Sequence, residues 1–157
     1  MQKMLVFGLM SSLHDVFTAL WVGGLLTTAL SLMPALKKLG IKSDPARQIL
    51  KSYQNRLRVF TVISVVVLWI TGLLLAKQSG TGFNLLSFAT PYHALISVKH
   101  LIVTLMVMIG IYRGFILGRK VDDFTAQQQK MYAILIFINA FLGIVVLFLS
   151  GFSAAIA

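Results

Sequence analysis

Apolar residues dominate four long stretches of the chain, and most polar residues gather between them. The stretches are Leu5–Met33, Val59–Ala76, Ala94–Leu117 and Met131–Ile156. The hydrocarbon core of a bilayer is about 30 Å thick, so a helix that crosses it needs roughly 20 apolar residues. A helix also satisfies its own backbone polar groups in lipid, where no water is available. The pattern therefore predicts an all-α fold, an integral membrane four-helix bundle.

The residues that flank these stretches indicate where the helices end. We expect helices over about residues 4–34, 46–77, 92–118 and 124–156. No linker divides the chain, so 1–157 should form a single domain. The first stretch has the position of a signal peptide, but His14 and Asp15 interrupt it and no small-residue cleavage site ends it. We therefore expect a helix that is retained.

The chain carries a formal net charge of +10, and its basic residues cluster after the first and third stretches. They are Lys37, Lys38, Lys42, Arg47, Lys51, Arg56, Arg58, Arg119, Lys120 and Lys130. Positively charged connections stay on the cytoplasmic side. This asymmetry predicts an up-down topology in the cytoplasmic membrane, with both termini extracytoplasmic. It also favours contacts with the lipid bilayer over the binding of nucleic acid.

Two ionisable pairs interrupt the apolar stretches, His14 with Asp15 and Lys99 with His100. Charges inside a membrane are costly and usually mark a functional site. In an up-down bundle the first and third helices are diagonal neighbours that run in the same direction. The two histidines should therefore lie at a similar depth. We expect them to be the axial ligands of one haem b, because a bundle core is apolar and dry. The alternatives are that they hydrogen-bond each other or line a proton path.

Asp15 and Lys99 should reach the same side of that core. Residues advance about 100° per position along a helix with 3.6 residues per turn. Asp15 follows its histidine and Lys99 precedes its own, so both rotate toward one side when the histidines face each other. We expect a supporting charge pair between them, with a haem propionate as the alternative partner of Lys99.

Copper is the alternative to haem, and its site would lie at the extracytoplasmic end of the predicted bundle. The absence of cysteine excludes thiolate metal sites and covalently attached haem. Cu(I) also accepts methionine and histidine, so Met4, Met10, His14 and His93 form an alternative copper site. His93, with Met10, is a candidate second ligand site for a cofactor or metal; its other interpretation is an interfacial histidine that meets water or a propionate. No comparable methionine ladder continues inward, and this favours haem.

The end of the third stretch has a glycine at every fourth position, Gly110, Gly114 and Gly118. Such a face lets helices approach closely in a membrane, so we expect it to pack against a neighbour. Arg113 lies near the inner end of the same stretch. We expect its side chain to extend to the lipid headgroups.

Three segments resemble the CopD (copper-resistance protein D) family. LHDVFTALWVGGLL resembles the first helix of that family, a histidine followed by a Trp-Val-Gly-Gly stretch. LRVFTVISVVVLWITGLLLA resembles the second, with Arg58, Phe60 and the pair Thr71–Gly72. VKHLIVTLMVMIGIYRG resembles the third, with Lys99 at the family's lysine position. The resemblance implies copper uptake or copper resistance.

The same superfamily contains the HemJ haem-binding proteins, which are linked to protoporphyrinogen oxidation. They pair a first-helix histidine with a third-helix lysine, a pattern that His14 and Lys99 match. Their Leu-Pro-Arg motif is reduced here to Pro34 without the arginine, and this departure counts against porphyrinogen oxidation. His100 offers a second ligand that the HemJ pattern does not require.

The sequence therefore favours a membrane b-type haem protein with one haem between the first and third helices. We expect it to carry electrons between quinol and an extracytoplasmic redox partner as an electron-transfer haem protein, with an oxidoreductase as the alternative; no catalytic residue is assigned. Copper handling and HemJ-like oxidation are the alternatives. A structural subunit of a larger complex is a third hypothesis, and a homo-oligomer is compatible with each.

The charge pair generates a first prediction. Asp15→Asn leaves Lys99 without its counter-charge, so we expect lower thermal stability or weaker retention of the cofactor. Thermal unfolding in detergent and the ratio of haem to protein measure these two properties. A variant that matches the wild type in both would contradict the pair.

Overall fold

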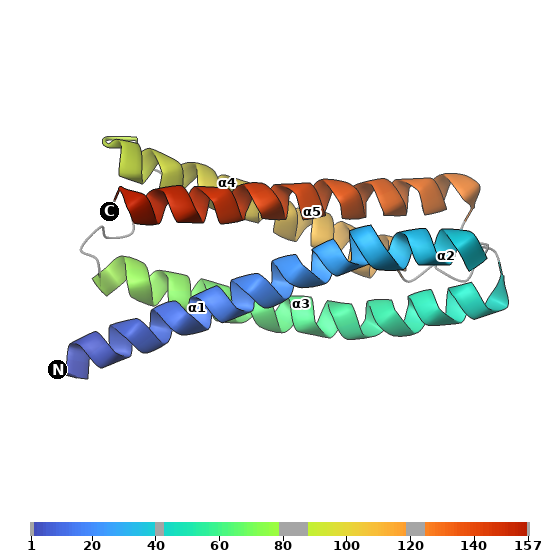
Figure 1. Ribbon diagram of the computed structural model, residues 1–157, viewed down its shortest axis with the longest axis horizontal. Helices are drawn as coiled ribbons and strands as arrows, with labels where there is room; N and C mark the ends of the chain where they lie inside the picture. The colour runs from blue at the N-terminus through green and yellow to red at the C-terminus, as the bar shows by residue number, and fades with distance from the viewer. Residues whose placement is uncertain (1, 40–42, 79–87, 119–124, 157) are drawn as a thin grey trace.

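The structure is a computed structural model that describes residues 2–39, 43–78, 88–118 and 125–156. Its elements are α1 (Gln2–Thr27), η1 (Thr28–Leu32), α2 (Met33–Leu39), α3 (Asp44–Gln78), α4 (Pro91–Ile111), η2 (Tyr112–Leu117) and α5 (Ala126–Ala155), where η denotes a π-helix. The described elements are all helical, as predicted, and form an elongated bundle (Figure 1). Some basic residues of the predicted topology signal lie outside the described residues: Lys42, Arg119 and Lys120.

Four helical stretches in the described part of the chain are long and apolar enough to cross a membrane. They are Met4–Lys38, Asp44–Lys77, Pro91–Leu117 and Ala126–Ala155. The outward surface is apolar too: Phe60, Trp69 and Ile70 of α3 are each more than half exposed. Water would disfavour so much exposed apolar surface, whereas lipid accepts it. The chain is therefore a multi-pass membrane protein, as the sequence predicts.

The starts of α4 and α5 follow from local sequence. Thr90 caps α4 by accepting a hydrogen bond from the backbone N–H of His93, and Pro91 occupies the first turn, where a missing N–H costs nothing. Thr125 and Gln128 form a reciprocal capping box at the start of α5. Both caps satisfy backbone donors that a helix leaves unpaired at its first turn.

The first span continues through Pro34 to Leu39, beyond residue 34, where the sequence pattern predicts its end. Proline lacks an N–H, and its ring collides with the carbonyl four residues earlier. The helix widens into the π-helix η1 just before Pro34, and a widened turn accommodates such a ring. The Thr28 hydroxyl in this turn donates to the Gly24 carbonyl at 2.6 Å and lies 3.0 Å from the Tyr53 hydroxyl. The widened turn is thereby joined to α3.

Helix packing leaves one side of the bundle open. α1 packs against α3 and α5, and α4 packs against α5, whereas α3 and α4 hardly touch. The buried core includes Val22 and Leu25 of α1, Met106 of α4 and Ile136 of α5. Gly143 of α5 is essential to this contact, because a Cβ there would lie 2.9 Å from a Val22 methyl and 3.4 Å from Met106 Cε.

The glycine face that continues from α4 into η2 meets a neighbouring helix, as predicted, only toward Gly118. Gly110, Gly114 and Gly118 all line a pocket, and a Cβ at Gly110 would meet open space. A Cβ at Gly114 would lie 3.9 Å from the Arg58 side chain, and one at Gly118 would lie 3.3 Å from Gln54 Oε1. α4 packs on α5 and α3 packs on α1, so long α3 side chains rather than close backbones reach this face.

Gly143 tests the observed packing. Gly143→Leu forces the Val22 and Met106 side chains apart, and overpacking of this kind costs about 1–3 kcal/mol. We expect a clearly lower melting temperature in detergent. Gly151→Leu is the matched control, because a Cβ at Gly151 has no neighbour within 4 Å. Equal melting temperatures for the two variants would show that the α1–α4–α5 contact is not as described.

Candidate functional site

His14 is half-buried on α1, and its ring lies against α3. The imidazole Nδ1 is 2.9 Å from the Thr71 hydroxyl oxygen. A Cβ at Gly72 would lie 3.7 Å from the ring Cε1, so the small residue gives the ring a flat surface to rest on. Thr71 is 1% exposed. One polar contact therefore joins α1 to α3 inside the apolar part of the bundle.

The hydrogen bonds of Thr71 to its own helix determine whether His14 or Thr71 is the donor in the contact between them. Its hydroxyl oxygen lies 2.7 Å from the Val67 carbonyl oxygen and 3.3 Å from that of Leu68. Carbonyl oxygens only accept, and the hydroxyl has a single proton, so Thr71 donates to its own helix. The Thr71 oxygen then accepts from the Nδ1–H of His14. This assignment leaves the lone pair of His14 on Nε2.

His100 on α4 has the same tautomer as His14, but its Nδ1 bonds to a backbone carbonyl instead of a side chain. Its Nδ1 lies 2.7 Å from the Ile96 carbonyl oxygen, one turn earlier in the helix. That oxygen can only accept, so Nδ1 carries the proton and Nε2 carries the lone pair. Each histidine also has a threonine four residues later whose hydroxyl donates to the histidine's backbone carbonyl, Thr18 at 2.8 Å and Thr104 at 2.9 Å.

The four ionisable residues singled out by the sequence share one region of the structure. The charges of Lys99, Asp15 and His100 all act on the His14 imidazole, and Asp15 acts on Lys99. Lys99 is half-buried and Asp15 is exposed. No direct ion pair joins Asp15 to Lys99 in the part of the chain that the structure describes, and Asp15 acts on Lys99 over a longer distance. The ion pair itself stays a prediction.

His93 makes local contacts at the start of α4. Its Nδ1 lies 2.6 Å from the Thr90 hydroxyl, and its ring stands edge-on to that of Tyr92, with 5.7 Å between ring centres. No hydrogen bond connects His93 to Met10 among the described residues, and Met4 is 80% exposed. Within the described ranges, no three His, Asp or Glu side chains gather as a group that could hold a metal ion.

The position of the Arg113 side chain differs from the predicted one. The side chain was expected to extend to the headgroups, but Arg113 is only 5% exposed and its guanidinium lies 5.6 Å from the centre of the Tyr132 ring. The neighbouring glycines Gly110 and Gly114 leave space inside the bundle, and the residue belongs to the π-helix η2. The sequence did indicate that Arg113 is unusual, because an arginine in an apolar stretch needs either the lipid headgroups or a partner within the protein.

Comparison of the chain with protein-family models, with curated proteins and with solved structures finds no significant match. The resemblance to the CopD and HemJ proteins therefore rests on the quoted segments and stays a prediction.

The assigned tautomer of His14 depends on Thr71. Thr71→Val removes the acceptor while nearly preserving the shape of the side chain, so we expect His14 to lose its fixed Nδ1–H tautomer. Nitrogen NMR of ¹⁵N-histidine-labelled protein without haem measures the tautomer directly. Thr18→Val is the matched control, because Thr18 bonds the His14 backbone and not its ring. A His14 tautomer that survives in Thr71→Val would refute the assignment.

Proposed function

We propose that the protein is a membrane b-type haem protein that carries electrons between quinol and an extracytoplasmic acceptor. The observation that carries this proposal is the state of the two intramembrane histidines. In each, Nδ1–H is donated to a fixed acceptor and Nε2 is left with its lone pair. Histidines that bind metals almost always donate their other ring N–H to a carbonyl or similar acceptor.

The donor set suits haem. Two neutral imidazoles from different helices are the axial ligands of many b-type haems, and His14 and His100 come from α1 and α4. These helices do not pack directly against each other, so ligands from both can meet without backbone contact. Haem bound there supplies one-electron redox chemistry, with a potential set by its axial ligands and surroundings.

The surrounding residues hold the ligands and balance charge. Thr71 and the Ile96 carbonyl fix the orientation of the two rings, and loss of such an outer partner costs about 10–100-fold in metal affinity. Lys99 supplies a positive charge beside His14, where a haem propionate or Asp15 can balance it. Both histidines belong to helices that are apolar enough to cross a membrane, where little water is available.

The proposed orientation is an up-down bundle with both termini extracytoplasmic. In Figure 1 the start of α1 and the end of α5 lie at one end of the bundle, and the end of α2 and the start of α3 lie at the other. Lys37 and Lys38 end α2, and Arg56 and Arg58 follow in α3, so positive charge gathers at that second end. Positive connections stay in the cytoplasm. His14 then belongs to the outer half of the membrane, on the side of the proposed acceptor.

The histidines make the proposal testable. His14→Ala and His100→Ala each remove one axial ligand, so we expect both variants to lose the spectrum of a six-coordinate low-spin haem. A reduced-minus-oxidised absorption spectrum of protein purified from haem-replete cells measures this. His93→Ala is the matched control and should keep the spectrum, because His93 contacts Thr90 and Tyr92.

One result would overturn the haem function, and another would reassign its second ligand. A colourless wild-type protein that carries copper by metal analysis would favour the copper alternative, with ligands among Met4, Met10, His14 and His93. A coloured protein whose spectrum survives His100→Ala would place the second ligand elsewhere, with Lys99 the first residue to examine.

A further inference from the structure

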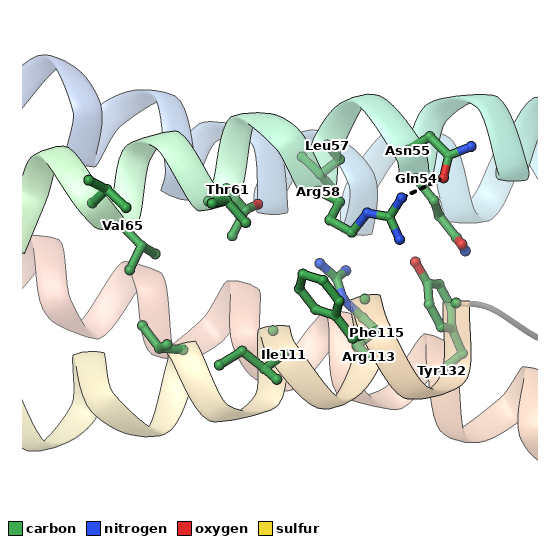
Figure 2. A pocket seen from close by; sticks show the side chains of 16 residues that line it. Gln54, Asn55, Leu57, Arg58, Thr61, Val65, Ile111, Arg113, Phe115 and Tyr132 are labelled. Carbon is green, nitrogen blue, oxygen red and sulfur yellow. Dashed lines mark hydrogen bonds between the residues drawn. The ribbon is translucent and has the colours of Figure 1, made fainter.

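A pocket of about 310 Å³ lies in the gap between α3 and α4 (Figure 2). Its polar end is lined by Gln54, Arg58, Arg113 and Tyr132. Its apolar end is lined by Val62, Val65, Val66 and Val107. The polar end lies toward the start of α5 and the basic part of α3, so one pocket spans the change from polar to apolar surroundings.

Arg113 is the buried cation of this pocket. Its guanidinium is part of a side chain that is 95% buried, yet neither Nε nor Nη1 has a hydrogen-bond partner. The contact with the face of Tyr132 does not satisfy these donors. A buried charge with unsatisfied donors is costly unless an anion completes the site.

Arg58 adds a second cation from the opposite wall. It lies over the Phe115 ring at 5.5 Å and donates one hydrogen bond to Asn55 at 3.3 Å. Figure 2 shows Arg58 and Arg113 extending into the pocket from α3 and η2. Like charges that converge in a site of low dielectric repel each other. No carboxylate lines the pocket among the described residues, so its own side chains do not neutralise the two arginines.

The change from a polar to an apolar lining indicates which kind of anion the pocket would bind. α3 changes from polar to apolar after Arg58, which is the depth of a headgroup in a spanning helix. An occupant that matches both ends has an anionic head and an apolar tail. We propose that the pocket binds one anionic phospholipid, with its phosphate between Arg58 and Arg113 and an acyl chain along Val62, Val65 and Val107. Guanidinium groups bind phosphate through paired hydrogen bonds, and basic pockets between spanning helices hold anionic lipid headgroups.

This site is independent of the proposed haem. Arg58 precedes Thr71, the partner of His14, by thirteen residues on the same helix. That separation is about 20 Å along an α-helix with a rise of 1.5 Å per residue. A propionate of a haem bound at His14 therefore does not reach Arg58, and the lipid site can be tested separately.

Native mass spectrometry of the full-length protein in detergent tests the proposal, with phosphatidylglycerol and phosphatidylcholine of identical acyl chains as probes. We expect the wild type to retain one phosphatidylglycerol more tightly than phosphatidylcholine. Arg58→Gln and Arg113→Gln should each weaken phosphatidylglycerol binding by about tenfold, the loss expected for a charge-assisted hydrogen bond. Arg56→Gln is the matched control, because it removes an equal charge from an exposed position of α3 outside the pocket.

A glycine variant tests the apolar end without removing a charge. Gly110 lines the pocket, and a Cβ there meets open space, so Gly110→Leu fills the cavity without a backbone collision. We expect it to weaken both lipids, whereas Gly151→Leu, which also enters open space, should weaken neither. This variant and Arg58→Gln carry the test if Arg113→Gln does not fold.

Three results would overturn the proposal. The two lipids could bind the wild type equally, or Arg56→Gln could weaken binding as much as Arg58→Gln does. Millimolar inorganic phosphate could also displace phosphatidylglycerol, which would make the occupant a soluble anion. The haem content of the same samples separates this test from that of the proposed function, because the pocket variants should leave it unchanged.

Discussion

The hydrogen bond from the His14 imidazole to the Thr71 hydroxyl is the interaction on which the proposed chemistry depends. In lipid no water competes for either group, so the bond is stronger than it would be at a wet surface. Thr71 is in turn held by carbonyls of its own helix, and this chain of bonds gives the ring one orientation and one tautomer. The same hydrogen bond thus helps to hold α1 against α3 and fixes the direction in which the Nε2 lone pair points.

α5 positions the helix that carries His100 relative to the helix that carries His14. α1 and α4 both pack on α5, and Gly143 brings Val22 of α1 and Met106 of α4 to the same point of that helix. Nearby, the buried Asn139 side chain donates to the Met106 carbonyl at 3.3 Å. Contacts with a helix that carries neither histidine therefore help to set the depth and rotation of His100 relative to His14. On α5 these contacts are made by a small residue, Gly143, and a polar one, Asn139, as expected where lipid removes the hydrophobic driving force between helices.

Hydropathy and charge predicted the helical fold and the four spans, because those properties depend on local composition. The partners of individual side chains could not be predicted in the same way. Thr71 lies in a segment that resembles the second helix of the CopD family, but only the packing of α1 on α3 identifies it as the partner of His14. The glycine repeat predicted a close helix contact, yet Gly110 faces a gap and only Gly114 and Gly118 meet side chains of α3. The burial of Arg113 follows from that same gap, which no pattern along a single helix reveals.

The separation of α3 from α4 has a consequence for how a molecule would enter and leave the pocket. Exposed residues such as Val62, Ile111 and Phe115 form part of its lining, so the entrance faces the bilayer rather than the aqueous phase. Exchange would then proceed by lateral diffusion in two dimensions. Occupancy would follow the mole fraction of the ligand in the membrane, and a change in lipid composition would alter it while the concentration of solutes in the cytoplasm stayed constant.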